Sequence, residues 1–183
     1  DMGFSGIEVY NLPKFDPMVD RSGPFHKYQA AATARQLREK KLTIPCFDTS
    51  CDLTAENVSA ESIVEIMDIA RNMRVPYISV VALEENEEQV RSLLERLLPV
   101  AEEKQITVLV KTSGIYADTA RLRRMLDSFA SDHLAALWDV HHPYRDMGES
   151  GDATIKNLGS YVCHVHLRDS DDTGAYQLIG EGT

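Results

Sequence analysis

Strand-like and helical segments alternate along the whole sequence, and this alternation limits the fold more than any other feature. Six apolar runs are expected to be strands, at residues 6–10, 42–47, 77–83, 107–112, 134–140 and 162–167. Five segments between them have helical patterning, at residues 32–41, 59–73, 85–105, 118–131 and 152–159. This alternation predicts α/β units around a parallel sheet.

The polar residues at the strand ends favour a (β/α)8 barrel over an open doubly wound sheet. Neither G-x-G-x-x-G nor G-x-x-x-x-G-K-[ST] follows an expected strand, so the nucleotide-binding open sheets lose their main support. The carboxyl ends of the strands instead carry the ionisable residues Glu8, Asp48, Lys111, Asp139, His141, His142, His164, His166 and Asp169. A barrel's catalytic face requires such a distribution, and a complete barrel takes about 250 residues. The sequence therefore predicts a single incomplete TIM barrel domain over residues 1–183, with the first strand before Asp1 and the last after Thr183.

Overall charge and composition limit the partners. The chain has 19 Lys and Arg residues against 29 Asp and Glu, a net charge of -10, and no long basic run. Nucleic-acid phosphates need a basic surface, so we expect a small-molecule ligand and no nucleic acid. Three cysteines without C-x-x-C spacing favour a reducing, cytoplasmic location. No apolar run approaches the roughly 18 residues of a membrane span, so no membrane partner is expected.

Two segments are expected to interrupt the regular pattern. Residues 13–27 are rich in Pro, Gly and Asp, which makes this loop the best candidate for a mobile lid. Pro99 lies inside a long helical pattern and should bend or break that helix, because proline lacks the backbone N–H. Ser59 and Asp118 precede helical patterns and are candidate N-caps.

Two of the expected strands end in the same chemistry. The segment "WDVHHPYRD" contains a carboxylate and two imidazoles, and "YVCHVHLRDSD" repeats that pattern about two dozen residues later. Burying such groups without a partner is costly, so the two strand ends are expected to form one shared site. Arg168 in the second segment could bind a substrate phosphate or carboxylate, or pair with Asp169 or Asp171.

Together, "GIEVY", "WDVHHPYRDMGES", "HVHLRDSD" and the terminal "LIGEGT" resemble the xylose-isomerase-like barrel superfamily of sugar phosphate isomerases and epimerases, which also resembles endonuclease IV. The resemblance implies a divalent metal, Mn, Mg, Co or Zn, held at the carboxyl end of the barrel by a Glu, an Asp, a His and a second Glu. It assigns Asp139 and His166 as metal ligands and places His142 beside the substrate or the metal. The second Glu would lie on strand eight, and Glu181 is expected to be a loop residue of the G-E-G motif.

Lys111 departs from the pattern that the resemblance implies. The family pattern resembles "ALETHG" and this chain reads "VLVKTSG", so a lysine stands where a glutamate ligand is expected. An ammonium cannot ligate a cation and would repel one strongly in a site of low dielectric constant. Three interpretations stay open. Lys111 supplies positive charge while paired with Asp139, forms a Schiff base with a carbonyl substrate, or neutralises the acidic cluster of an inactive barrel.

Proton transfer next to a carbonyl is the reaction that the resemblance implies. A base removes a proton from the adjacent carbon, and the enediolate oxygens then need positive charge, which a metal supplies. We therefore predict a sugar or sugar-phosphate isomerase or epimerase acting on a small sugar, polyol or sugar acid. The candidate catalytic residues are Lys111, His142, Glu8 and Arg168. A dehydratase or Schiff-base lyase using Lys111 and a non-catalytic ligand-binding barrel are the alternatives, and a homo-oligomeric assembly stays open.

Overall fold

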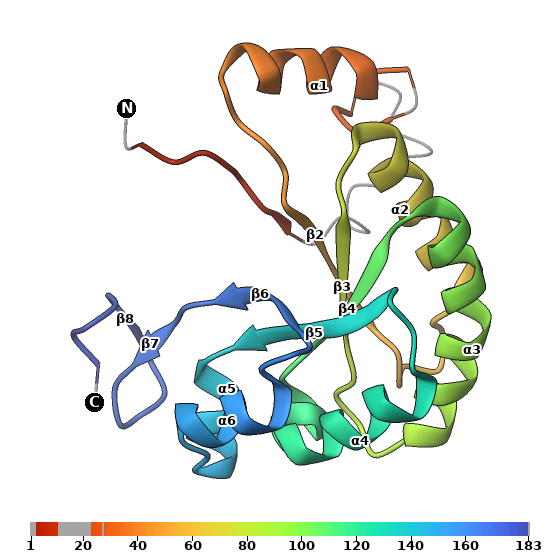
Figure 1. Cartoon of the computed structure of the whole chain (residues 1–183). Coiled ribbons are helices and arrows are strands. Elements are labelled where there is room, and N and C mark those ends of the chain that lie inside the picture. The colour runs from red at the N-terminus through yellow and green to blue at the C-terminus, as the bar shows by residue number, and fades with distance from the viewer. Residues whose placement is uncertain (1–2, 11–22, 27, 183) are drawn as a thin grey trace.

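The computed structural model of the chain describes residues 3–10, 23–26 and 28–182. Its largest sheet is parallel and contains β1 (Val9–Tyr10), β2 (Cys46–Asp52), β3 (Tyr77–Val81), β4 (Thr107–Lys111), β5 (Leu134–Asp139) and β6 (Val162–His166) in sequence order. The sheet is curled, and the helices cover its outer side (Figure 1). Parallel strands in sequence order with helices outside are the architecture of a partial β/α barrel, which confirms the predicted fold class.

The helices follow the expected alternation. They are α1 (Ala30–Glu39), α2 (Ala60–Met73), α3 (Glu87–Lys104), α4 (Thr119–Phe129), α5 (His141–Met147) and α6 (Gly151–Leu158), with the 3-10 helix η2 (Gly114–Ala117) before α4. Ser59 and Asp118 cap α2 and α4 as predicted, because their side chains accept hydrogen bonds from the backbone N–H of Ser62 and Arg121.

Pro99 was expected to bend or break its helix, and α3 continues through it, so a break is wrong. Pro99 is exposed, and water at that surface can hydrogen-bond the carbonyl of Glu95, which loses its partner inside the helix. An apolar face of α3 that includes Leu94, Leu97 and Ala101 stays buried against the sheet side. Burial of this face offsets the missing backbone hydrogen bond.

The two faces of the sheet have different chemistry because successive side chains along a strand point to opposite sides. On β4, Val108 and Val110 belong to the large core beneath the helices, whereas Leu109 joins a small inner cluster with Cys46, Ala135 and Leu137. This inner cluster lies on the concave face of the sheet. On the same face, the next residues toward the carboxyl ends of the strands are charged.

The strand boundaries differ most at β1 and β2. Residues 6–10 were expected to be a strand, but only Val9 and Tyr10 form the ladder, with an isolated bridge from Gly6 to Thr43. The strand expected at residues 42–47 begins at Cys46 and runs to Asp52. Pro45 explains the late start, because proline has no N–H for the ladder. A register shift between Asp48 and Cys51, around a left-handed residue at position 50, keeps the strand paired beyond its expected end.

Among the described residues, the sequence did not predict α5, η2 or the antiparallel hairpin of β7 (Asp169–Ser170) and β8 (Tyr176–Gln177). Most of the loop expected to be a lid, residues 13–27, lies outside the described residues. Within the described part of the chain, no helix is long and apolar enough to cross a membrane.

Candidate functional site

The concave face of the sheet carries the site. Asp48 on β2, Lys111 on β4 and Asp139 on β5 each lie two residues beyond a member of the inner apolar cluster, so their side chains share its face. All three residues are buried, with 1%, 5% and 0% of their surface exposed. Charged groups at this depth need partners. Their contacts define how the site is assembled.

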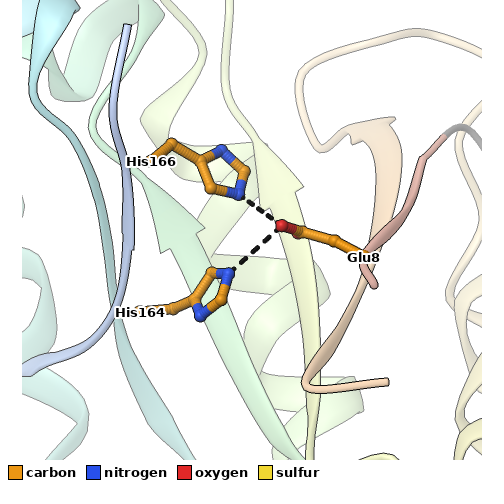
Figure 2. Close-up of side chains that lie close together, drawn as sticks. All are labelled: Glu8, His164 and His166. Atoms are coloured by element: carbon orange, nitrogen blue, oxygen red, sulfur yellow. Dashed lines mark hydrogen bonds and ion pairs between the residues drawn. The ribbon is translucent and has the colours of Figure 1, made fainter. Parts of the chain in front are cut away.

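Glu8, just before β1, meets two histidines of β6 across the concave face (Figure 2). Glu8 Oε2 lies 2.7 Å from His166 Nε2 and 3.2 Å from His164 Nε2. The three side chains retain 16–23% exposure. Burial alone would raise the pKa of Glu8, but hydrogen bonds and attraction from the two histidines outweigh it and lower the pKa from 4.5 to about 2.

Two ion pairs lie on the same face. Lys111 Nζ donates to Asp48 Oδ2 at 2.7 Å, and Arg168 Nε lies 3.1 Å from Asp139 Oδ2. The hypothesis that Lys111 pairs with Asp139 is therefore wrong, and so is the pairing of Arg168 with Asp169 or Asp171. Asp48 on β2 lies two strands from Lys111 on β4, a distance that the long lysine side chain spans. Asp139 instead meets Arg168, the second residue after β6.

A cavity of about 320 Å³ opens at the carboxyl ends of the strands, and its walls include Lys111, Ser113, His142 and Arg168. A cavity of this volume suits a small ligand. His142 Nδ1 lies 2.9 Å from Asp146 Oδ2, one turn later on α5. A carboxylate on one ring nitrogen orients the imidazole and leaves Nε2 to exchange protons with a ligand.

The G-E-G motif organises a loop rather than adding a charged group to the cavity. Asp169 Oδ2 accepts hydrogen bonds from the N–H groups of Gly180 and Gly182, which lowers the pKa of Asp169. A Cβ atom at Gly182 would collide with the Asp169 carboxylate. Glu181 is exposed in this loop, as the sequence predicted.

The structure divides the residues singled out from the sequence into three groups. His166 and Glu8 come together with His164. Lys111, Arg168 and His142 line the cavity, whereas Asp139 faces Arg168 and stands outside the Glu8 group. Sequence reasoning missed Asp146 because its pairing with His142 requires α5. It missed Ser113 because a lone serine after a strand carries no distinctive signal.

The Glu8, His164 and His166 side chains fit a divalent metal. One ligand atom from each lies within 4.8 Å of the other two, and within the described residues no other group of this kind occurs. Glu8 Oε1 is buried and has no hydrogen-bond partner among the described residues, so the carboxylate has an unused ligand atom. Two imidazole nitrogens and a carboxylate are a donor set typical of catalytic zinc, with a further position left open for water or substrate.

Comparison with solved structures agrees with the fold. A xylose isomerase domain protein from Planctomyces limnophilus aligns over 97% of this chain and 73% of its own, with 14% identity and a TM-score of 0.78. Endonuclease IV from Thermus thermophilus aligns over 98% and 74%, with 20% identity and a TM-score of 0.71. The IolI protein with a bound zinc atom aligns over 99% and 67%, with 14% identity and a TM-score of 0.68.

No curated protein matches the sequence. A family model described as a xylose isomerase-like TIM barrel matches residues 1–183, the whole of the sequence. This match agrees with the parallel strand order and with the ionisable residues at the carboxyl ends of the strands. The chain therefore belongs to the xylose isomerase-like TIM barrel family.

Proposed function

We propose that this protein is a divalent-metal-dependent isomerase or epimerase that moves a proton next to the carbonyl of a small sugar, sugar acid or sugar phosphate. The Glu8, His164 and His166 cluster is the observation that carries the proposal, because it offers a metal two nitrogens and a carboxylate inside a family barrel. A zinc atom is bound in the IolI protein, whose structure resembles this one. When bound, the metal would supply positive charge for the oxygens of an enediolate.

Residues of the cavity wall carry out proton transfer and substrate binding in this proposal. His142 removes the proton from the carbon next to the carbonyl, and Asp146 orients its ring at 2.9 Å. Lys111 and Arg168 hold the substrate from the cavity wall. The buried carboxylates Asp48 and Asp139 keep these two cations in place.

The ion pair of Lys111 argues against the Schiff-base alternative. A Schiff base forms by attack of a neutral amine, so Lys111 would first have to give up a proton while in contact with Asp48 at 2.7 Å. Asp48 would then remain as a buried carboxylate without its cation, and such a charge typically costs about 3–5 kcal/mol. We therefore assign Lys111 to substrate binding.

Metal content tests which residues hold the ion. After dialysis against trace Zn and Mn, elemental analysis is expected to give about one metal per chain. Glu8→Gln and His164→Gln should each lose it, because each removes one of three ligands. Asp139→Asn is the matched control, since Asp139 faces Arg168. Metal lost in Asp139→Asn and kept in Glu8→Gln would instead favour the ligand set that the family resemblance implies.

Deuterium exchange tests the reaction itself. Candidate aldoses, ketoses, sugar acids and sugar phosphates are incubated with the metal-loaded protein in D2O, and NMR follows deuterium entering the carbon next to the carbonyl. His142→Asn should lower the exchange rate by about 10²-fold or more, because general-base catalysis typically contributes 10²–10⁴-fold. His133→Asn is the control, since His133 contacts the Ile106 carbonyl at the other end of the sheet. Equal loss in both variants would contradict the role of His142.

A further inference from the structure

The cavity at the carboxyl ends of the strands has more unused hydrogen-bond donors than acceptors. Lys111 lines it and is 5% exposed, yet the described residues give its ammonium one hydrogen bond, to Asp48. An ammonium has three N–H donors, and leaving buried donors unpaired is costly. Two donors of Lys111 therefore remain for a ligand.

Ser113 and Arg168 add donors to the same wall. The Ser113 hydroxyl is buried and has no hydrogen-bond partner among the described residues, although the side chain lines the cavity. Arg168 places Nε near Asp139 and donates from Nη1 to the Tyr176 hydroxyl at 3.0 Å, and Nη2 has no hydrogen bond within the described part of the chain. Three side chains from separate segments thus offer unused N–H or O–H groups to one space.

Fewer acceptors than donors are left over on this wall, and the carboxylate of Asp146, which also lines the cavity, already contacts His142 through Oδ2. One oxygen of Asp48 accepts from Lys111, and the other accepts from the backbone N–H of Ser50. Asp139 accepts from the His141 N–H with one oxygen, and its other oxygen is ion-paired with Arg168 Nε at 3.1 Å but accepts no hydrogen bond among the described residues. The excess of unused donors favours a ligand group made of acceptors alone over an uncharged polyol, in which every hydroxyl also brings a donor that needs an acceptor.

We propose that this cavity binds an anionic, oxygen-rich group of the substrate, a carboxylate or a phosphate, through Lys111, Ser113 and Arg168. The inference rests on the proposed function and deepens it, because it names a chemical group that the substrate carries. Tyr10 and Arg168, on the cavity wall, lie two residues beyond Glu8 and His166. Two residues of chain span at most about 7 Å between their Cα atoms, so this part of the cavity wall lies next to the residues of the metal cluster.

Calorimetric titration with three matched three-carbon probes tests the proposal. Glycerate carries a carboxylate, glycerol 3-phosphate carries a phosphate, and glycerol carries neither. All titrations use the whole chain in EDTA, so binding is read without metal or turnover and stands apart from the proposed reaction. At least one anion is expected to bind at least tenfold more tightly than glycerol, and the tighter anion identifies the group. Equal binding of glycerol, or no binding of either anion, would overturn the proposal.

Variants then locate the binding site. Lys111→Met should weaken anion binding at least tenfold and Ser113→Ala several-fold, whereas Lys40→Met, which removes an exposed lysine at the end of α1, should leave it unchanged. Because Lys111→Met leaves Asp48 buried without its cation, the double variant Asp48→Asn/Lys111→Met is measured as well, with circular dichroism to check folding. Full anion affinity in the folded double variant would place the anion elsewhere and refute the assignment. Full affinity in both single variants, Ser113→Ala and Lys111→Met, would refute it as well.

Discussion

One carboxylate oxygen of Glu8, near the start of the chain, contacts two histidines near its end. Its partners His164 and His166 are 156 and 158 residues away. Sequence reasoning named Glu8 as a candidate but could not find this contact, because nothing in a strand end tells which distant side chain it will face. The same holds for Lys111, whose partner is Asp48 rather than Asp139. Residue types at strand ends were predictable, and their pairing was not.

The lowered pKa of Glu8 predicts how acid affects the metal-free protein. A carboxyl whose pKa falls from 4.5 to about 2 on folding adds stability above pH 4.5, and that stability is lost as the pH falls toward 2. The contribution is at most about 3–4 kcal/mol, since one pKa unit corresponds to about 1.4 kcal/mol. Urea unfolding in EDTA should therefore show a gap between the stabilities of wild type and Glu8→Gln that narrows as the pH falls from about 5 toward 2. A gap independent of pH would contradict the pairing.

At the scale of elements, the sequence predicted helix boundaries best where an apolar stripe repeats over several turns. The boundaries of α2, α3 and α4 lie within two residues of those expected, because their apolar stripes span several turns. The short helix α5 was missed, since seven residues that include two histidines and Pro143 show no stripe. Pro143 is tolerated there because it lies in the first turn, where the backbone N–H has no partner within the helix.

Pro99 in α3 makes a prediction at this scale. Pro99→Ala restores a backbone N–H to the helix and should raise the free energy of unfolding by about 1–2 kcal/mol, because proline is about 3 kcal/mol less favourable than alanine inside a helix and part of this is offset in the unfolded chain. Urea unfolding measures the change. Ser92→Ala, also exposed on α3, is the control and should change stability by less than about 0.5 kcal/mol. A Pro99→Ala variant no more stable than that control would show that α3 is already relaxed around the proline.

At the scale of the whole molecule, strand order and layering followed from the sequence, whereas the geometry of the site did not. Alternating strands and helices restrict the chain to parallel units with short connections, so the order β1 to β6 was accessible. The distance between β1 and β6 depends on how strongly the sheet curls, which no local pattern encodes. The candidate metal cluster lies across that gap. For this reason the contact of Glu8 with His164 and His166 was not predicted, although all three residues were placed at strand ends.

Net charge gives the prediction for the whole molecule. With a net charge of -10, the chain should not bind DNA at physiological salt, even though endonuclease IV shares its fold. Fluorescence anisotropy with a labelled duplex containing an abasic site should show no binding at micromolar protein, with or without zinc. Salt-dependent binding in the micromolar range would contradict the small-molecule assignment.

The contact between Glu8 and the two histidines also has a thermodynamic consequence. An ion that binds all three joins strands from opposite edges of the sheet, so its binding free energy is also folding free energy. By mass action, an ion present at about a hundred times its dissociation constant adds about 2.7 kcal/mol to the stability of the folded chain. Metal supply would then set how much of the protein is folded as well as how much is active.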